Sequence, residues 1–151
     1  MVEEKILNKE KEIWKELGDK EKRLRILSDF KQNRVTIVDP EHTYIESKAR
    51  IGKDTLILPN VFIFLDTVIG EKCIIWSSNV IIGSKIGNSV AIESFCKIEK
   101  AHIGDSVTIR SHSKVAAGSK IGNGAKIGPQ ACLKPGAIIK DGLDIGKADI
   151  G

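Results

Sequence analysis

Aliphatic side chains recur at every sixth position along most of this chain. The stretch IGDSVTIRSHSKVAAGSKIGNGAKIG, residues 103–128, shows the pattern clearly, and the same register runs from Ile45 to Ile150 with only three steps of five residues. A period of six matches neither the 3.6 residues of an amphipathic helix nor the 2 residues of a half-buried strand. It is typical of a chain that runs a short strand, turns a corner and starts again.

Each six-residue unit has two positions that can point inward. The fourth residue after the aliphatic one is usually small or branched, as at Cys73, Cys96 and Ala125. A glycine often follows the aliphatic residue, and we expect glycine there because a corner needs a backbone free of Cβ strain. These glycines are Gly52, Gly70, Gly87, Gly104, Gly122, Gly128, Gly146 and Gly151.

The strongest Ile-Gly pairs group the six-residue units into coils. Three units make one coil, as shown by the nearly constant spacing of the pairs that begin at Ile51, Ile69, Ile86, Ile103 and Ile121. Residues 45–151 are therefore predicted to form about six stacked coils of a triangular parallel β-helix, an all-β solenoid with aliphatic ladders along its axis. A β-sandwich would instead show strands roughly 8 to 12 residues apart with hairpin turns between them.

Residues 1–34 follow a different pattern. Apolar residues recur there at spacings of three, four and seven among many charged ones, which predicts an amphipathic helix, or two helices broken near Gly18. We therefore expect two parts, a helical N-terminal segment over residues 1–34 and the β-helix over residues 35–151. The apolar residues of the predicted helical stripe are Ile6, Ile13, Trp14, Leu17, Leu24, Leu27 and Phe30.

The first coils also place apolar residues at outward positions. Leu58 and Trp76 form one such pair, because three repeat units, and therefore one coil, separate them. The equivalent positions of later coils are mostly polar. An apolar patch confined to the early coils is more often covered than left bare, and the cover is either the helix of the same chain or a neighbouring subunit. The other outward apolar pairs are Phe62 with Val80 and Phe64 with Ile82.

Composition and charge fit a soluble protein with one elongated domain. The chain has 151 residues, of which 41% are hydrophobic, and no run approaches the roughly 18 apolar residues of a membrane-spanning helix. The first residues, MVEEKILNKEKEIWKEL, are too charged for a signal peptide, so a cytoplasmic location without a membrane partner is expected. The net charge of +4 is small and spread along the chain, so it does not by itself indicate nucleic acid binding.

The three cysteines do not suggest a disulfide or a metal site. Cys73 and Cys96 both fall on the small inward position, where a buried thiol acts as a small hydrophobic side chain. Cys132 is expected to face outward and has no partner cysteine nearby in the sequence. An odd number of cysteines without CxxC spacing is typical of a reducing compartment.

The three histidines could in principle supply the three protein ligands of a catalytic zinc ion. A resemblance to γ-class carbonic anhydrase would imply such a site between subunits. The spacing does not favour it, because His42 precedes the first coil, His102 sits at a corner, and His112 lies in the next rung. We therefore expect solvated histidines and no metal.

Two longer stretches resemble a known enzyme family. They are RVTIVDPEHTYIESKARIGKDTLILPNVFI, which contains VTIVDP and TYI, and IGPQACLKPGAIIKDGLDIG, which contains a GPxAxL[RK]PG pattern from Gly128 to Gly136. Over roughly residues 20–147 the chain resembles the region that joins the two halves of bacterial bifunctional N-acetylglucosamine-1-phosphate uridyltransferase and glucosamine-1-phosphate N-acetyltransferase. The resemblance implies a left-handed parallel β-helix of hexapeptide repeats, an exception to the usual right-handed crossover, and it implies homotrimers.

The resemblance also implies substrates and a site residue. The acetyltransferase half of that family binds a sugar phosphate and acetyl-CoA between subunits, and it uses an arginine of an LRPG motif and a later histidine as general base. The arginine position corresponds to Lys134 in this chain. Lysine could pair with a phosphate as a point charge, without the bidentate fork of arginine. The alternative is a solvated lysine on a corner.

Two departures from the family pattern limit the expected activity. Residues 1–34 lack the Gly-rich, Arg-containing phosphate loop of the nucleotide-binding domain, so uridyl transfer is not expected. No histidine follows the GPQACLKPG segment, and the sequence stops just after Ile150 opens a new rung, so we expect a truncated module without a catalytic residue. The remaining aspartates are poor substitutes, because an exposed carboxylate with a reference pKa of about 4 is a weak base at neutral pH.

Two classes of function remain open on the sequence alone. One is an acyltransferase-family module on the route to UDP-N-acetylglucosamine, with acetyl-CoA as co-substrate if it is active and no cofactor held in the chain. The other is a non-catalytic trimeric scaffold or oligomerisation module. We expect the chain as given to transfer no acetyl group, because transfer needs a base within hydrogen-bond reach of the amine and a pocket that fixes the donor.

Overall fold

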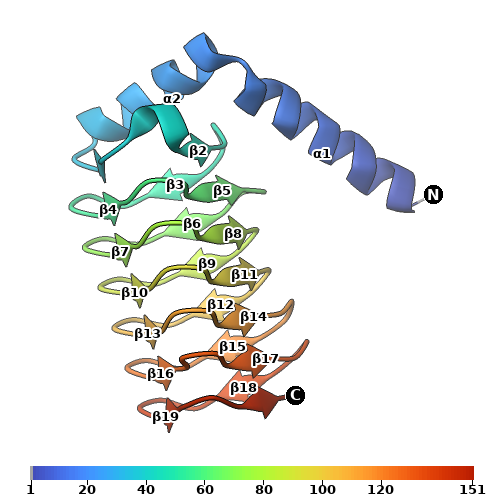
Figure 1. Cartoon of the computed structure of the whole chain (residues 1–151), viewed down its shortest axis with the longest axis vertical. Coiled ribbons are helices and arrows are strands. Elements are labelled where there is room, and N and C mark those ends of the chain that lie inside the picture. The colour runs from blue at the N-terminus through green and yellow to red at the C-terminus, as the bar shows by residue number, and fades with distance from the viewer. Residues whose placement is uncertain (1) are drawn as a thin grey trace.

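The chain forms a parallel β-solenoid with two helices at its N-terminal end. The computed structural model describes residues 2–151, apart from the side chains of Val2, Glu3 and Ile6, so Ile6 of the predicted stripe lies outside the described side chains. Helix α1 (Val2–Gly18) and helix α2 (Lys20–Gln32) precede a column of stacked triangular coils (Figure 1). The predicted left-handed parallel β-helix of about six coils is confirmed.

Three parallel sheets form the three faces of the column, here named faces A, B and C. Face A consists of β1 (Thr36–Ile37), β4 (Leu56–Ile57), β7 (Ile74–Ile75), β10 (Ala91–Ile92), β13 (Thr108–Ile109), β16 (Lys126–Ile127) and β19 (Asp144–Ile145). Face B consists of β2 (Tyr44–Ile45), β5 (Phe62–Phe64), β8 (Val80–Ile82), β11 (Lys97–Glu99), β14 (Lys114–Val115), β17 (Cys132–Leu133) and β20 (Asp149–Ile150). Face C consists of β3 (Arg50–Ile51), β6 (Val68–Ile69), β9 (Lys85–Ile86), β12 (His102–Ile103), β15 (Lys120–Ile121) and β18 (Ile138–Ile139).

Equivalent residues pair in register from one coil to the next. On face B, Ile63 pairs with Ile81, and on face C, Ile103 pairs with Ile121. The side chains of these aliphatic residues are buried and form one continuous apolar core along the axis. Each strand therefore presents an outward residue directly before its inward aliphatic one, and the outward residues also stack in rows.

The solenoid begins one rung before the six-residue register indicated. Ile37 pairs with Ile57 on face A, although eight residues separate Ile37 from Ile45 on the next face. The extra residues form the short 3₁₀ helix η1 (Pro40–His42), which lies between β1 and β2. Because of this insertion, a search for a period of six does not find the first rung.

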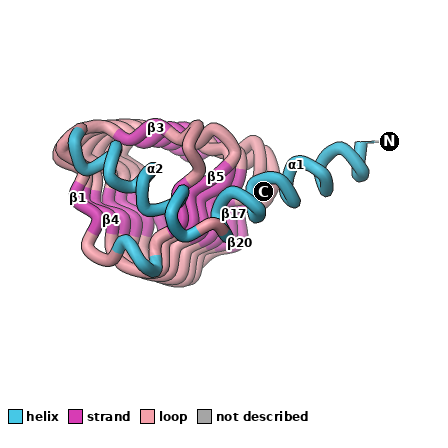
Figure 2. The backbone as a smooth tube through the Cα atoms, turned by 90° about the horizontal axis from the view of Figure 1, so that it is seen from above, coloured by secondary structure: helices cyan, strands magenta, loops and turns pink. Residues whose placement is uncertain are grey.

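Helix α2 closes the N-terminal end of the solenoid. It lies across the top of the first coil (Figures 1 and 2), and its buried residue Leu27 joins the same core cluster as Ile37. Leu24 and Phe30 pack against this cluster from the same helix. A solenoid needs such a cap because its terminal coil has no neighbour on one side.

The chain bends between the two helices, as the sequence indicated for the region of Gly18. Asp19 is the N-cap of α2, and its Oδ1 accepts a hydrogen bond from the backbone N–H of Lys22 at 3.1 Å. This arrangement satisfies one of the N–H groups that a helix start leaves without a partner. Within residues 2–151, neither helix is long and apolar enough to cross a membrane.

A buried arginine fixes the bend to the first coil. Arg23 is 7% exposed, and its guanidinium donates hydrogen bonds to the carbonyl oxygens of Leu17 and Glu41, both at 3.0 Å. The same guanidinium lies 4.5 Å from the centre of the Tyr44 ring, within cation–π range. Arg23 therefore links the end of α1, the body of α2 and the first strand of face B.

Helix α1 covers the outward apolar pairs of face B. Ile13 and Leu17 are buried against Phe64, and the ring of Trp14 lies 5.9 Å from the ring of Phe64 between centroids. The remaining members of these pairs pack in the same cluster, namely Phe62, Val80 and Ile82. The sequence left two alternatives for what covers this patch, namely the helix of the same chain or a neighbouring subunit. Over these residues the cover is the helix of the same chain.

The outward pair Leu58 and Trp76 is not covered in this way. Trp76 lies at the turn from face A to face B and remains 46% exposed. The N-terminal part of α1 leads away from the coils (Figure 2), and Leu7 on it is 50% exposed. Trp76 and Leu7 are therefore among the apolar side chains that remain open to solvent in the single chain.

The glycines after the aliphatic residues are needed for a different reason from the one expected. Of those eight, only Gly128 has a positive φ, so corner strain does not explain the others. A Cβ on Gly104 would collide with Oδ1 of Asn123, one coil further along. That oxygen accepts a hydrogen bond from the backbone N–H of Asp105 at 2.8 Å. The same close packing of an Asn or Asp side chain recurs at Gly70, Gly87 and Gly122.

Replacing Gly104 by alanine should therefore destabilise the fold. The added methyl group would push Asn123 away from the N–H of Asp105, and such overpacking costs about 1 to 3 kcal/mol. Gly146 is the matched control, because it also follows an aliphatic residue, has no positive φ and has no atom within 4 Å of an added Cβ. Thermal unfolding followed by circular dichroism measures both variants. A Gly104→Ala midpoint equal to that of Gly146→Ala would contradict this explanation.

Candidate functional site

Lys134 lies in a late coil, where the chain turns from face B to face C. Its backbone N–H donates to the carbonyl oxygen of Ile150, and its own carbonyl oxygen accepts from Oγ of Ser119 at 3.3 Å. Both partners belong to neighbouring coils, so the stack fixes the backbone of Lys134. The side chain is exposed and takes part in none of the ion pairs found within residues 2–151. Its ammonium group is therefore free to donate to an anion.

The column that contains Lys134 also carries a carboxylate. The strand pairing places Glu99, Ala116 and Lys134 at the same turn in three successive coils. Neighbouring strands lie about 4.8 Å apart, so the backbones of Glu99 and Lys134 are about 10 Å apart. The small side chain of Ala116 leaves the surface between them open. This edge can contact a small molecule that has an anionic group at one end and a cationic or hydroxyl group at the other.

Sequence reasoning identified Lys134 but did not assign a site role to Glu99. A signal was present in the spacing, because positions 99, 116 and 134 follow one another at intervals of one coil. The signal could be used only after the outward rows had been traced through all coils. Glu99 is partly buried at this turn.

The structure does not bring the three histidines together. Oδ2 of Asp39 accepts a hydrogen bond from Nδ1 of His42 at 2.8 Å, and this bond lowers the pKa of the Asp39 carboxyl. His112 stacks on Phe95 at a corner between faces A and B, with ring centroids 5.0 Å apart. His102 lies on face C. Within residues 2–151, no group of three His, Cys, Asp or Glu side chains is arranged to hold a metal ion.

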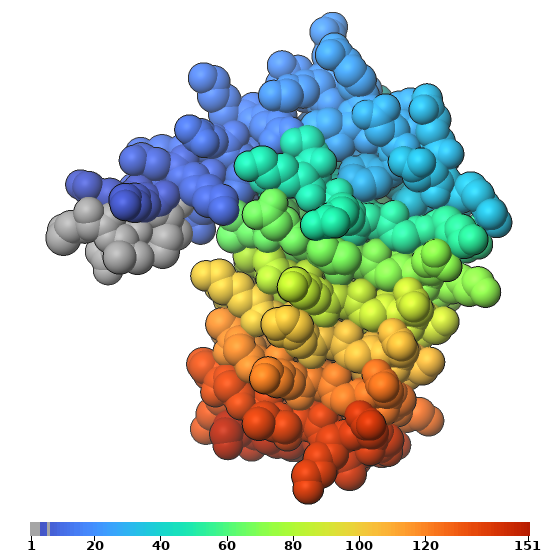
Figure 3. Space-filling model, turned by 180° about the vertical axis from the view of Figure 1, so that it is seen from behind, coloured from blue at the N-terminus to red at the C-terminus, as the bar shows by residue number. Residues whose placement is uncertain are grey.

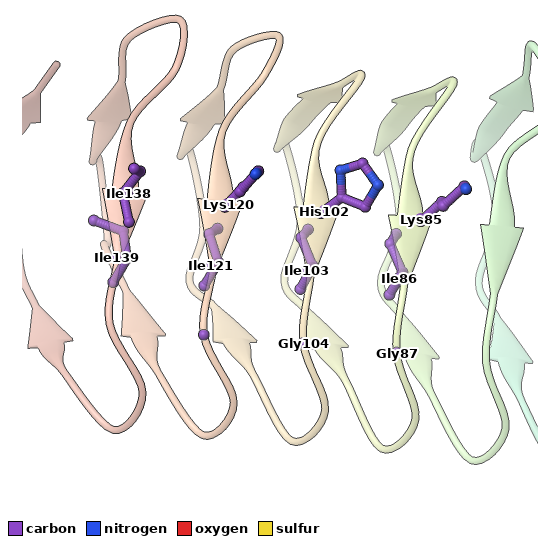
Figure 4. Close-up of a pocket in the computed structure, with 11 residues that line it drawn as sticks. Lys85, Ile86, Gly87, His102, Ile103, Gly104, Lys120, Ile121, Ile138 and Ile139 are labelled. Atoms are coloured by element: carbon purple, nitrogen blue, oxygen red, sulfur yellow. The ribbon is translucent and has the colours of Figure 1, made fainter.

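A shallow hollow of about 600 Å³ runs along face C (Figure 4). Lys85, His102 and Lys120 line it, one from each of β9, β12 and β15, and the close-up shows them in one row. Register pairing joins Lys85 to His102 and His102 to Lys120. These three residues are far apart in the sequence and become neighbours only when the coils stack.

The predicted burial of Cys73 and Cys96 is confirmed, with exposed fractions of 0% and 2%. Burial raises the pKa of both thiols, and that of Cys96 reaches about 11. The Sγ of Cys73 lies 3.2 Å from the carbonyl oxygen of Gly87, so it packs against the next coil. Cys132 is partly exposed, and all three cysteines are free. The two buried thiols are parts of the core and not of a reactive site.

The six-residue repeat, the triangular coil and the three parallel faces define the fold, and known proteins resemble the chain in sequence and in this fold. In sequence, the chain is similar to the bifunctional protein GlmU of Geotalea uraniireducens, with 46% identity over 84 residues, 56% of this chain and 18% of that protein. It is also similar to bifunctional protein GlmU of Alkaliphilus oremlandii, with 39% identity over 98 residues, 62% of this chain and 22% of that protein. The family resemblance noted in the sequence is thus confirmed. The chain spans about a fifth of the length of these curated relatives.

In fold, the chain is similar to perosamine N-acetyltransferase from Caulobacter crescentus, which was solved in complex with CoA and GDP-perosamine. The TM-score is 0.66 at 12% sequence identity, and the match covers 85% of this chain and 65% of that one. No family model matches the chain. The structural match establishes the fold, and the sequence match establishes the resemblance to bifunctional protein GlmU.

The three thiols should differ sharply in their reaction with iodoacetamide. Alkylation requires the thiolate, so at pH 8 the partly exposed Cys132 should react in the native protein while Cys73 and Cys96 do not. Raising the pH to 9.5 should still leave Cys96 unmodified, because its pKa of about 11 keeps it protonated and its side chain is buried. Peptide mass spectrometry after digestion counts the modified sites. Rapid alkylation of Cys73 or Cys96 in the folded protein would show that the strand register is wrong.

Proposed function

We propose that this chain is an acyltransferase module that binds an amino-sugar phosphate and acetyl-CoA, on the route to UDP-N-acetylglucosamine. The observation that carries the proposal is the 46% identity to bifunctional protein GlmU over 84 residues. The exposed Lys134 in the GPQACLKPG segment supports it, because the resembled family has a phosphate-binding arginine at that position. A cytoplasmic site of action is part of the proposal, since sugar phosphates and acetyl-CoA are cytoplasmic metabolites.

In this proposal the ammonium group of Lys134 holds the sugar phosphate. A lysine ammonium has three N–H donors and a full positive charge, and hydrogen bonds to charged groups contribute about 1.5 to 3 kcal/mol. Lysine contacts the phosphate as a single point, so it orients the sugar less than an arginine fork would. Glu99, in the same column, would then orient the other end of the sugar through its amino or hydroxyl groups.

Binding and turnover are separate parts of the proposal. N-acetylation requires a base that takes the proton of the attacking amine. His102 lies on face C and His112 at the turn from face A to face B, whereas Lys134 lies at the turn from face B to face C. Glu99 is a carboxylate, and a carboxylate is a weaker base than the imidazole that the resembled family uses. We therefore expect the chain by itself to bind the sugar phosphate without acetylating it.

Calorimetric titration with glucosamine-1-phosphate tests the binding step. The unmodified chain should bind it, and Lys134→Ala should weaken binding about tenfold or more, as expected for the loss of one charge-assisted contact. Lys126→Ala is the matched control, because it removes one exposed lysine from a neighbouring coil on face A. Its affinity should stay within about twofold. Equal losses for both variants would show an effect of net charge only and would reject the site.

Thiol release from acetyl-CoA tests turnover in the same samples. The chain and its Lys134→Ala variant should give the same background rate. A rate for the unmodified chain well above that of the variant would overturn the expectation of binding without transfer and would place an active site in these coils. If neither substrate binds while the protein stays folded, a non-catalytic scaffold becomes the better explanation.

We also propose that the module assembles as a homotrimer with parallel solenoid axes. The resembled family supports this, and so do the two exposed apolar surfaces around Trp76 and Leu7. Light scattering at micromolar concentration should give three times the mass of one chain, and Trp76→Glu should shift the mass towards that of one chain. Lys53→Glu, an exposed charge change in the early coils, is the control and should remain a trimer. A single-chain mass for the unmodified protein would reject the trimer.

A further inference from the structure

Face C carries a row of two lysines and one histidine that the proposed sugar-phosphate site does not use. Lys85, His102 and Lys120 occupy the outward position of consecutive strands β9, β12 and β15, and all three are exposed. Parallel strands of one sheet lie about 4.8 Å apart, so the three side chains are spaced about 5 Å apart at their backbones. The two lysines, which lie two strands apart, both carry a positive charge, and an anion bound between them lowers their mutual repulsion.

The row has no internal counter-charge on its own face. The outward residues that precede and follow it are Val68 and Ile138, which are apolar. None of the ion pairs within residues 2–151 includes Lys85, His102 or Lys120. The two lysine ammonium groups and the His102 ring therefore face solvent without a carboxylate partner among the described residues.

The acidic residues at the adjacent corner are already engaged. Oδ1 of Asp105 accepts a hydrogen bond from the backbone N–H of Asn88, and Oδ1 of Asp141 accepts one from the backbone N–H of Asn123, both at 2.8 Å. These bonds hold the two carboxylates against the backbone of the previous coil. Neither carboxylate forms an ion pair with Lys85 or Lys120 among those found within residues 2–151.

The backbone makes the hollow beside this row. Gly87, Gly104 and Gly122 follow the inward isoleucines of the three strands and line the hollow, and an Asp or Asn side chain of the next coil packs directly against each of them. The result is a straight trough along the solenoid axis, with the cationic row on one side (Figure 4). Figure 3 shows the coils stacked as one continuous column.

We propose that this trough binds a chain of linked phosphate groups, such as an oligophosphate or the triphosphate of a nucleotide. The side chains of Lys85 and Lys120 are long and flexible, so their ammonium groups can converge on the phosphates of such a ligand from two strands apart, with the His102 ring between them. Two flexible ammonium groups with three donors each, flanking one imidazole, match phosphate oxygens better than they match a single carboxylate. The site is separate from Lys134, which lies at a different turn of the coil.

Titration with inorganic triphosphate, followed by calorimetry at low salt, tests the proposal. The unmodified chain should bind one triphosphate per chain, and the double variant Lys85→Ala, Lys120→Ala should lose at least tenfold in affinity. The matched control is Lys114→Ala, Lys126→Ala, which removes two exposed lysines from the same outward position on faces B and A. This control should bind within about twofold of the unmodified chain. Equal losses for the two double variants, or no binding by the unmodified chain, would overturn the proposal.

The NMR signals of His102 report on binding at face C itself, which general attraction of an anion to a positively charged protein would not affect selectively. The ring C–H signals of His102, assigned by their loss in His102→Gln, should shift in proton NMR during the titration, while those of His42 should not. Shifts of both histidines would indicate diffuse attraction and would reject a site on face C.

Two further titrations distinguish a nucleotide from a free phosphate chain as the ligand, and face C from the turn at Lys134 as the site. If ATP binds as tightly as triphosphate, the trough recognises phosphates alone, and if ATP binds more tightly, the nucleotide is the preferred source. Lys134→Ala should leave triphosphate binding unchanged, so failure of the sugar-phosphate proposal and failure of this one give different results. A tenfold loss of triphosphate affinity in Lys134→Ala would show that the phosphates bind at the turn and not on face C.

Discussion

The pairing of each coil with the next is the interaction on which the rest of this structure depends. Strand N–H groups donate hydrogen bonds to carbonyl oxygens of the following coil, as Gly104 N–H does to Ile121 and Arg110 N–H to Ile127. This pairing holds only if equivalent residues stay in register, because a slip of one residue would turn every aliphatic side chain outward. The inward rows, the outward rows and the glycine contacts between coils all follow from that single register.

The same constraint explains why the candidate sites lie on edges and faces. The interior is filled by aliphatic side chains, so a ligand can contact only outward positions and turns. A row of outward residues brings together groups that are one coil apart in sequence, and this gives both the Glu99 and Lys134 edge and the cationic row on face C. The backbone beneath each row is rigid because both of its sides are paired, so the side chains start from fixed positions. The first coil has a neighbouring coil on one side only. Helix α2 and Arg23 support its other side.

Much of the fold follows from the sequence because the repeat is short and strict. Ile51, Ile69 and Ile86 define the coil length without any structure, and Cys73 and Cys96 are placed inward by the same count. The six-residue register starts only at Ile45 and omits the rung that contains Ile37, because η1 breaks the period between them. Asn79 was also missed as an inward residue, since an amide is not a typical core side chain; it is fully buried, and its Oδ1 accepts a hydrogen bond from the N–H of Cys96 at 2.8 Å. A prediction from periodicity fails where an insertion interrupts the period or where an inward position holds a residue type that is unusual in a core.

By itself the sequence determined the coil, its inward residues, the helical segment within residues 1–34 and the position of Lys134 in its motif. Each of these depends on local spacing. Only the tertiary structure decided which face α1 covers, that the three histidines lie apart, and that Gly104 is required by Asn123 of the next coil. It also decided that Lys85, His102 and Lys120 form a row with open space beside it. These features depend on contacts between residues one or more coils apart and on the bend at Asp19. Such contacts exist only once the register and the packing of the helices are fixed in three dimensions.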